Sequence, residues 1–123
     1  MTVVKTQSIQ QDEFLLSQAK GMRSRDQVTV TVAGGVLLPS GTTLGAITST
    51  GKYIKHVNSA SDGSQVACAV LSTPLDGADI VNGDYQAVVY SRDCEVNAAL
   101  LNGGAGLDTG AGAELKTFGI VPR

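Results

Sequence analysis

The chain has 123 residues, of which 42% are hydrophobic but only 4% aromatic, and a formal net charge of −2 at pH 7. This length fits one domain with one core, which valine, isoleucine, leucine and alanine must fill because the chain has no tryptophan. The weak net charge gives no case for binding nucleic acid. No apolar run reaches the ~18 residues that a membrane span needs, so we expect neither nucleic acid nor membrane as a partner.

Residues 1–25 differ from the rest of the chain in composition. They are polar and rich in Gln and Ser, with one apolar patch, FLL, at residues 14–16. They carry four basic and two acidic side chains, whereas residues 26–123 carry five basic and nine acidic ones. Residues 12–19 could form two helical turns, although isolated helices of this length are marginal in water. Both a disordered terminus and an arm that docks on another surface fit this pattern.

The first strong strand signal is the alternation in residues 27–32, QVTVTV. Its three valines should face the core and its two threonines the solvent, because successive side chains of a strand point to opposite faces. Gly34-Gly35 should end this strand. Residues 36–38, VLL, predict a short apolar strand that ends at a turn containing Pro39.

Residues 44–71 predict three further strands separated by two turns. The strands are expected at residues 44–48, 52–57 and 66–71, with turns at 50–51 and 58–63. The last of these strands is a nearly continuous apolar run, which suits a buried strand.

The remainder of the chain continues this pattern of short elements. Strands are expected at residues 84–92 and 118–121, helical turns at 111–117 with Asp108 or Thr109 as the N-cap, a flexible loop at 102–106, and either strand or helix at 95–101. Seven or eight short strands with little helix indicate an all-β fold with small helical pieces.

Three blocks of the chain form a recognisable series: EFLLSQAKGMRSRDQVTV at 13–30, LGAITSTGKY at 44–53 and NSASDGSQVACAVL at 58–71. Together these ordered blocks resemble the lambda-type bacteriophage head decoration protein family, and the resemblance extends over roughly residues 12–121. It implies a β-clip-like, bent-ribbon single domain with an extended N-terminal arm, and no catalytic residues.

The resemblance also implies a structural role on a virus particle. Members of this family sit as homotrimers on the outer surface of an assembled capsid and stabilise it against internal DNA pressure. Residues 1–25 would then be a flexible arm that docks on the major capsid protein, and residues 26–123 the β-rich decoration domain. The capsid-binding residues of the arm would be Phe14, Leu15, Leu16, Ser17, Arg23, Ser24 and Arg25. The protein would be made in the cytoplasm of a bacterial host and end in the virion.

Two short motifs match enzyme signatures only in part. Asp108-Thr109-Gly110-Ala111 spells the aspartic protease signature, but too little chain follows it for the rest of that fold. Residues 79–85, DIVNGDY, loosely resemble the Asp-and-Tyr motif of trimeric dUTP pyrophosphatases, but the spacing differs and no basic Gly-rich phosphate loop follows. We therefore expect a decoration protein and not an enzyme. The alternatives are another virion spike or tail module, or a trimeric nucleotide pyrophosphatase-like enzyme.

Histidine and cysteine are scarce in this chain. His56 is the only histidine, and without a nearby cysteine pair it does not indicate a zinc site; we expect it on a solvated strand face beside Lys52. Cys68 and Cys94 lie in unlike contexts, so we expect reduced thiols rather than a disulfide, with Cys68 as a small core hydrophobe. We expect neither a metal nor a cofactor.

Overall fold

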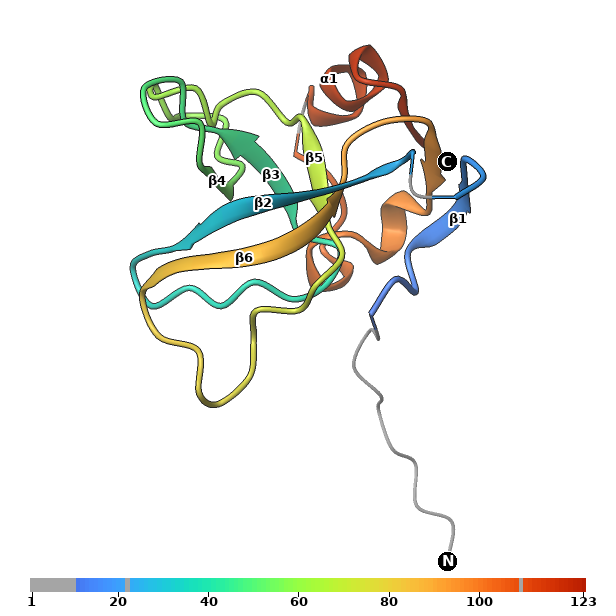
Figure 1. The fold of residues 1–123 in the computed structure, drawn as a ribbon. Helices are drawn as coiled ribbons and strands as arrows, with labels where there is room; N and C mark the ends of the chain where they lie inside the picture. The colour runs from blue at the N-terminus through green and yellow to red at the C-terminus, as the bar shows by residue number, and fades with distance from the viewer. Residues whose placement is uncertain (1–10, 22, 109) are drawn as a thin grey trace, which may run out of the picture.

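The structure, a computed structural model, describes residues 11–21, 23–108 and 110–123, and consists mainly of short strands (Figure 1). In chain order the elements are β1 (Leu15–Gln18), β2 (Arg25–Val32), β3 (Thr43–Ala46), β4 (Tyr53–Lys55), β5 (Ala69–Leu71), β6 (Gly83–Tyr90), β7 (Cys94–Val96), the 3₁₀ turns η1 (Ala98–Leu100) and η2 (Asn102–Gly104), α1 (Ala111–Thr117) and β8 (Ile120–Pro122). The predicted all-β fold with small helical pieces is confirmed.

Five of the strands close into a barrel in the order β2-β4-β3-β5-β6. Its longest pair, β2 and β6, runs antiparallel side by side over eight residues of each strand (Figure 1). β4 closes the barrel by pairing in parallel with β2. Val30 and Val32 of β2 are buried in the interior, and Val28 packs against the same cluster. The predicted core-facing valines of residues 27–32 are therefore confirmed.

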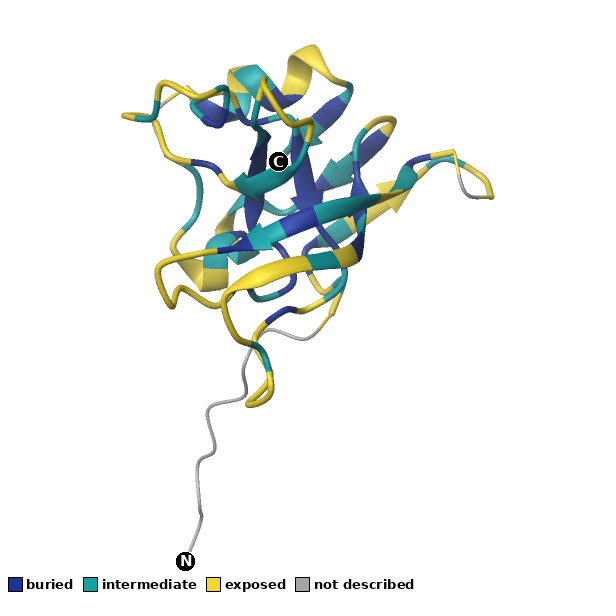
Figure 2. Cartoon of the chain, turned by 60° about the vertical axis from the view of Figure 1, so that its left-hand side comes forward, coloured by how far each residue is buried: buried dark blue, intermediate teal, exposed yellow. Residues whose placement is uncertain are grey.

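A second, three-stranded sheet combines strands from distant parts of the chain. β1 pairs antiparallel with β7, and β7 pairs in parallel with β8. A separate core cluster packs this sheet and α1 against the barrel: Phe14, Ala67, Val70, Tyr90, Cys94, Val96, Leu101, Ala111, Leu115 and Ile120. Figure 2 shows the buried positions gathered in the middle of the molecule, with the exposed positions in the loops around them.

β5 belongs to both cores because both of its faces are buried. Ala69 and Leu71 are part of the cluster inside the barrel, whereas Val70 between them packs in the second cluster. The end of β6 does the same, with Val89 in the barrel cluster and Tyr90 in the other. Since neighbouring side chains of a strand point to opposite faces, the wall of the barrel is also the floor of the second core.

Two glycines hold the loop before β5 tightly against β3. A Cβ on Gly45 would lie 2.6 Å from the backbone of Ser64, and a Cβ on Gly63 would lie 2.4 Å from the carbonyl oxygen of Ala46. Gly63 also has a φ of +111°, which residues with a Cβ rarely adopt. Asp62 fixes the same loop, because its carboxylate accepts hydrogen bonds from the backbone N–H and the hydroxyl of Ser64. The packing of backbone on backbone leaves room only for glycine.

Most of the predicted elements are found near their predicted positions. The predicted strands at residues 52–57 and 66–71 contain β4 and β5, and those at 44–48, 84–92 and 118–121 contain most of β3, β6 and β8. The helical turns predicted at 111–117 coincide with α1. The ambiguous residues 95–101 divide into the end of β7 and the 3₁₀ turn η1. The open question at residues 12–19 is resolved as β1, because pairing with β7 satisfies a backbone that is too short for a stable isolated helix.

The strand predicted at residues 36–38 is wrong. Of its three residues only Leu38 forms a bridge, to Leu75, and the other two side chains are nearly half exposed. Gly34 and Gly35 both have positive φ, so the chain turns away from the barrel after β2. Of the three apolar side chains at residues 36–38, only Leu38 is buried, and the other two lie on the surface.

Candidate interaction surface

The N-terminal segment is fixed to the body from residue 12 onward. The backbone N–H of Asp12 donates to the Ser40 hydroxyl at 3.0 Å, and the Ser72 hydroxyl donates to the Asp12 carboxylate at 2.7 Å. Phe14 then enters the second core, where it is 0% exposed, with its ring edge-on to Tyr90 and 5.8 Å between the ring centroids. Asp12 and Phe14 together form what we call the N-terminal anchor.

β1 follows the anchor and lies at the edge of its sheet. Among the described residues only β7 pairs with it, so one side of the β1 backbone has no neighbouring strand. Leu16 is 52% exposed on this strand, and Ser17 and Gln18 are also exposed. Figure 1 shows β1 at the periphery of the molecule. An edge strand of this kind offers N–H and C=O groups to which an extended segment of another chain can add.

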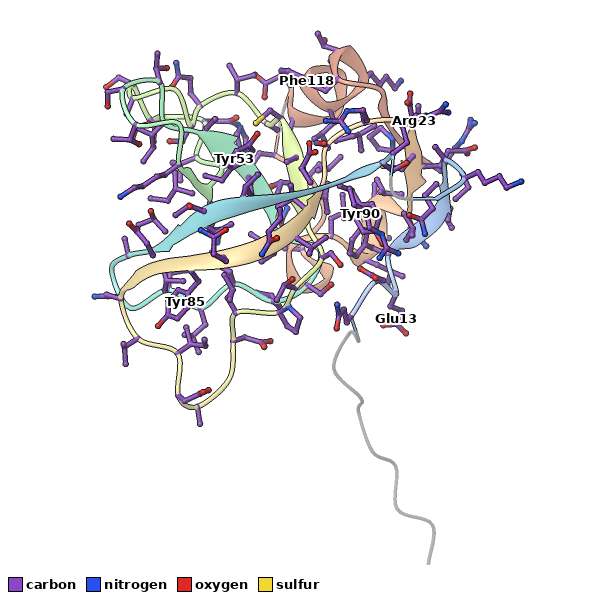
Figure 3. All side chains as sticks on the ribbon, viewed as in Figure 1. Glu13, Arg23, Tyr53, Tyr85, Tyr90 and Phe118 are labelled. Carbon is purple, nitrogen blue, oxygen red and sulfur yellow. The ribbon has the colours of Figure 1, made fainter. Side chains whose placement is uncertain are left out.

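The three residues before and at the start of β2 fold back on the body. The Arg25 guanidinium lies over the Tyr90 ring, 5.3 Å from its centroid. Ser24 is buried, and its hydroxyl donates to the backbone carbonyl of Asp93 at 2.9 Å. Arg23 is well exposed and makes a surface ion pair with the Asp93 carboxylate at 3.3 Å (Figure 3). Of these three residues, Arg23 is the one whose charge is open to another molecule.

An apolar groove, the Phe118 groove, lies where β4, the loop before β5 and the end of α1 approach one another. It encloses about 520 Å³, and its lining consists of Ala46, Tyr53, Gly63, Val66, Cys68 and Phe118, with Asp26, Ser91 and Arg92 as polar neighbours. Phe118 is 43% exposed, and Figure 3 labels it together with Tyr53. Exposed aromatic and aliphatic side chains around a hollow are typical of surfaces that meet another macromolecule.

The chemistry of this groove is that of a contact surface. At its polar end the Asp26 carboxylate accepts hydrogen bonds from the Arg92 guanidinium and the Ser91 hydroxyl. Burial raises the pKa of Tyr53 and the pKa of Cys68 above their ordinary values. Both side chains are therefore neutral at pH 7, and the Cys68 thiol is a poor nucleophile.

A second apolar hollow, the Val36 hollow, is a consequence of the segment that failed to form a strand. It encloses about 290 Å³, and its lining consists of Thr31, Ala33, Val36, Leu38, Ile54, Lys55 and Val57. Val36 and Val57 are both exposed at its rim, and Leu37 is exposed next to it in the chain. The described part of the chain thus presents two separate apolar surfaces.

The structure places His56 differently from the sequence-based expectation of a solvated face. His56 is only 3% exposed, and its Nε2 lies 3.0 Å from the backbone carbonyl oxygen of Gln65. The predicted N-cap of α1 is also different: Gly110 occupies that position without a side-chain cap, and Thr109 lies outside the described residues. Asp108 faces the His56 ring instead, with 3.7 Å between Oδ2 and Nδ1.

The residues of the dUTP pyrophosphatase-like motif have structural roles. The Tyr85 hydroxyl donates to the Val81 carbonyl at 2.8 Å, and Asp84 pairs with Lys52 and accepts from the Thr31 hydroxyl. Within residues 11–21, 23–108 and 110–123, no three His, Cys, Asp or Glu side chains are arranged to hold a metal ion. In the same described part of the chain, no helix is long and apolar enough to cross a membrane.

A family model described as bacteriophage lambda head decoration protein D matches residues 4–118, which is nearly the whole chain. The chain belongs to this family. The comparisons with curated proteins and with solved structures give no match. The resemblance seen in the three sequence blocks is thereby confirmed. As a member of the head decoration family, the chain is a capsid decoration protein associated with the virion, and its partner is a phage capsid.

For a head decoration protein the relevant question is which side chains its surface presents. Of the seven arm residues expected to bind the capsid, Leu16, Ser17 and Arg23 are exposed and Leu15 and Arg25 are half-buried, whereas Phe14 and Ser24 are buried. Phe14 and Ser24 contact the body in this conformation and are not available to another protein. The described residues from 12 onward pack against the rest of the body, and residues 1–10 lie outside the described residues.

Sequence reasoning missed three parts of this surface. The anchor at Asp12 depends on Ser40 and Ser72, which are 28 and 60 residues away in the chain, so no local pattern indicates it. The Phe118 groove likewise gathers residues from six separate segments. The Val36 hollow had a signal: Gly34-Gly35 before the VLL run is a stronger indication of a turn than of a strand.

Proposed function

We propose that this decoration protein binds the outer surface of an assembled phage head as a homotrimer and stabilises the shell against internal DNA pressure. Its membership in the head decoration family supports binding to a capsid. The observation that carries the location of the contact is the open edge of β1, with Leu16 exposed on it, directly after the N-terminal anchor. Residues 1–10 come shortly before β1 in the sequence, so we assign them and β1 to the same capsid contact.

Burial indicates which residues of the proposed arm can contact the capsid and which hold the arm on the body. For Phe14 to enter a capsid pocket it would have to leave the core, at a cost of about 3–5 kcal/mol as for other buried aromatic side chains. We therefore assign capsid contacts to residues 1–10, Leu16, Ser17 and Arg23, and assign to Phe14 the holding of this segment on the body. A segment ordered beforehand loses less conformational entropy on binding, so the anchor strengthens the contact.

A homotrimer would explain how weak contacts can bind and stabilise the capsid. In a closed trimer each copy offers one surface to the next copy and receives another, so two different surfaces are needed. The Phe118 groove and the Val36 hollow supply two distinct apolar surfaces. Three weak capsid contacts on one rigid trimer bind far more tightly than one contact alone. A trimer that binds only the assembled shell also stabilises that shell by mass action.

The test is occupancy on purified expanded capsids, measured by electron microscopy. We expect wild type to occupy three-fold positions on the outside. Deletion of residues 1–10 and the double variant Leu16→Ser/Arg23→Ser should each lower occupancy strongly. Val81→Ser is the matched control, because Val81 is an exposed aliphatic residue in a loop far from β1 in sequence. Circular dichroism checks the fold of each variant.

Three outcomes would count against the proposal. Equal occupancy of all variants would move the capsid contact to another surface. Single copies scattered on the shell would contradict the trimer, and unchanged resistance of decorated heads to bursting would contradict stabilisation. A deletion that also removes residues 11–20 is less informative, because it removes the anchor and β1 and so damages the fold itself.

A further inference from the structure

His56 is buried between the barrel and the segment that leads into α1. Its Nε2 lies 3.0 Å from the carbonyl oxygen of Gln65, which can only accept, so Nε2 carries a hydrogen. Its Nδ1 is buried and has no hydrogen-bond partner. The nearest charged group on that side is the Asp108 carboxylate, with Oδ2 at 3.7 Å from Nδ1. A buried hydrogen-bond acceptor without a donor is unfavourable, so Nδ1 of His56 is unsatisfied in this state.

A proton on Nδ1 would turn this nitrogen into a donor with Asp108 as its acceptor. The unprotonated nitrogen and the Asp108 oxygen are both acceptors, so they do not attract one another. With a proton on Nδ1 the imidazolium can donate to Asp108, and the distance can shorten from 3.7 Å to about 2.8 Å, the usual length of a charge-assisted hydrogen bond. Glu114 of α1, with Oε1 3.5 Å from Nε2, would also stabilise the positive ring. Lys55, which borders the same hollow, opposes it.

Asp108 is placed where such a bond would join two parts of the fold. On one side of it, Asn102 accepts a hydrogen bond from the Thr43 N–H of β3 at 2.9 Å. On the other side, Glu114 accepts one from the Ala67 N–H at 3.1 Å. Asp108 itself is 60% exposed and lies between these two attachments. A third attachment here would fix the whole segment from η2 to α1 on the barrel.

We propose that protonation of His56 closes a clamp between the barrel and the segment that carries α1. With a proton on Nδ1 the Asp108 carboxylate is bound to the His56 ring, which adds one attachment to those that Asn102 and Glu114 make; without that proton only the other attachments remain. This device does not depend on the proposed capsid contact, because neither β1 nor the anchor takes part in it. It makes the attachment of α1 depend on whether the His56 ring carries a proton on Nδ1.

The composition of the chain simplifies a test of this clamp. His56 is the only histidine. Hydrogen bonds and the ion pair with Lys52 lower the pKa of Asp84, hydrogen bonds from Ser64 lower the pKa of Asp62, and Arg123 lowers the pKa of Glu95, so these three carboxylates stay charged. Burial raises the pKa of Cys94 to about 11, so this thiol stays neutral. The comparison of wild type with the Asp108 variants then shows whether a pH-dependent change in α1 comes from the His56–Asp108 pair.

The direct test is nitrogen NMR of the single imidazole ring, with EDTA present to exclude metal ions. At pH 8 we expect hydrogen on Nε2 only. On lowering the pH to 5.5 a slowly exchanging proton should appear on Nδ1 in wild type. In Asp108→Ala the ring should lose this slowly exchanging signal. A ring that keeps Nδ1 unprotonated at pH 5.5, or the same exchange rate in both proteins, would overturn the clamp.

The second test is amide hydrogen exchange of α1, expressed as protection factors relative to β6 in the same sample. In wild type the protection of α1 should rise about two- to fivefold from pH 8 to pH 5.5, the range expected for one partly exposed ion pair. Asp108→Ala should abolish the rise. In Asp108→Asn the amide can donate to the unprotonated Nδ1, so α1 should be protected to the same extent at both pH values.

The control for the exchange experiment is Asp76→Ala, which removes an exposed carboxylate from a loop on the far side of β5 in the chain. It should keep the pH-dependent rise of wild type. A rise that persists in Asp108→Ala, or one that disappears in Asp76→Ala, would show that general charge effects and not the His56–Asp108 pair control α1.

Discussion

The two cores of this protein are built in different ways. The barrel core is formed by five strands, and its longest strand, β2, points alternating side chains such as Val30 and Val32 inward. The second core combines β1, β7 and β8, strands of three or four residues from distant parts of the sequence. Phe14 links them by filling the space between this sheet and the barrel wall. Both cores need long-range pairing, but the strand β2 of the barrel is long enough to show an alternating pattern, whereas the strands of the second core are too short to show one.

This difference predicts that the second core is the easier one to break. Phe14→Ala should lower the free energy of unfolding by about 3–5 kcal/mol, because it leaves a cavity where a fully buried ring had packed. Urea unfolding measures the loss. Amide exchange should show that β1 and β7 lose protection before the barrel does. Leu16→Ala in the same segment is the control and should change stability by no more than about 0.5 kcal/mol.

A matched substitution in the barrel core tests whether the two cores unfold separately. Leu44→Ala removes a fully buried side chain of β3 and should cost about 2–5 kcal/mol, but β2 to β6 should lose protection together. If Phe14→Ala and Leu44→Ala give the same pattern of exchange, the two cores unfold as one unit and the distinction between them has no energetic meaning.

The loop before β5 tests a contact that involves backbone alone. Gly63→Ala should cost about 2–4 kcal/mol, because a Cβ would lie 2.4 Å from the Ala46 carbonyl and the φ of +111° is strained for alanine. Gly51→Ala is the matched control: its φ is +74° and a Cβ there meets nothing within 4 Å, so only the strain of about 1 kcal/mol remains. Thermal or urea unfolding measures both; equal losses would show that crowding at Gly63 is relieved by movement of the loop.

The two cysteines report on the two regions separately. Cys94 is buried in the second core. Cys68, which we expected in the core from the sequence, is half-buried and lines the Phe118 groove. Cys94→Ser should cost about 1–3 kcal/mol because the hydroxyl is buried in apolar surroundings, and Cys68→Ser less than about 1 kcal/mol. A thiol reagent should modify Cys68 first in the native protein. Modification of Cys94 first would show that the second core opens readily.

The smallest expected effect is the acid sensitivity of one surface ion pair in each region. Hydrogen bonds from Lys52 and Thr31 lower the pKa of Asp84 on the barrel, and Arg123 lowers the pKa of Glu95 on the second sheet. A carboxylate whose pKa is lower in the folded state stabilises that state above its unfolded pKa, and the contribution is lost as pH falls through the folded value. Stability should therefore decline from about pH 4.5 downward. Asp84→Asn and Glu95→Gln should each flatten this decline slightly; a steeper decline in either variant would contradict the assignment.

The barrel strands, the helix α1 and the family could be predicted from the amino-acid sequence. Alternation in residues 27–32, the apolar run of residues 66–71 and the turn glycines act locally, so they can be seen in the order of residues. Gly45 and Gly63 belong to the same blocks that indicated the family, and their backbone contacts explain why that pattern needs glycine.

Which side chains of this decoration protein lie on its surface could not be predicted, because it depends on contacts between distant parts of the chain. Phe14 looked like part of a free arm because its burial depends on Tyr90, 76 positions further along the chain. His56 looked solvated because Gln65, Asp108 and Glu114 come together around it only when α1 packs on the barrel. These contacts join residues that are far apart in the sequence, so no periodic pattern of residues indicates them. The burial that results determines which side chains remain exposed to a partner.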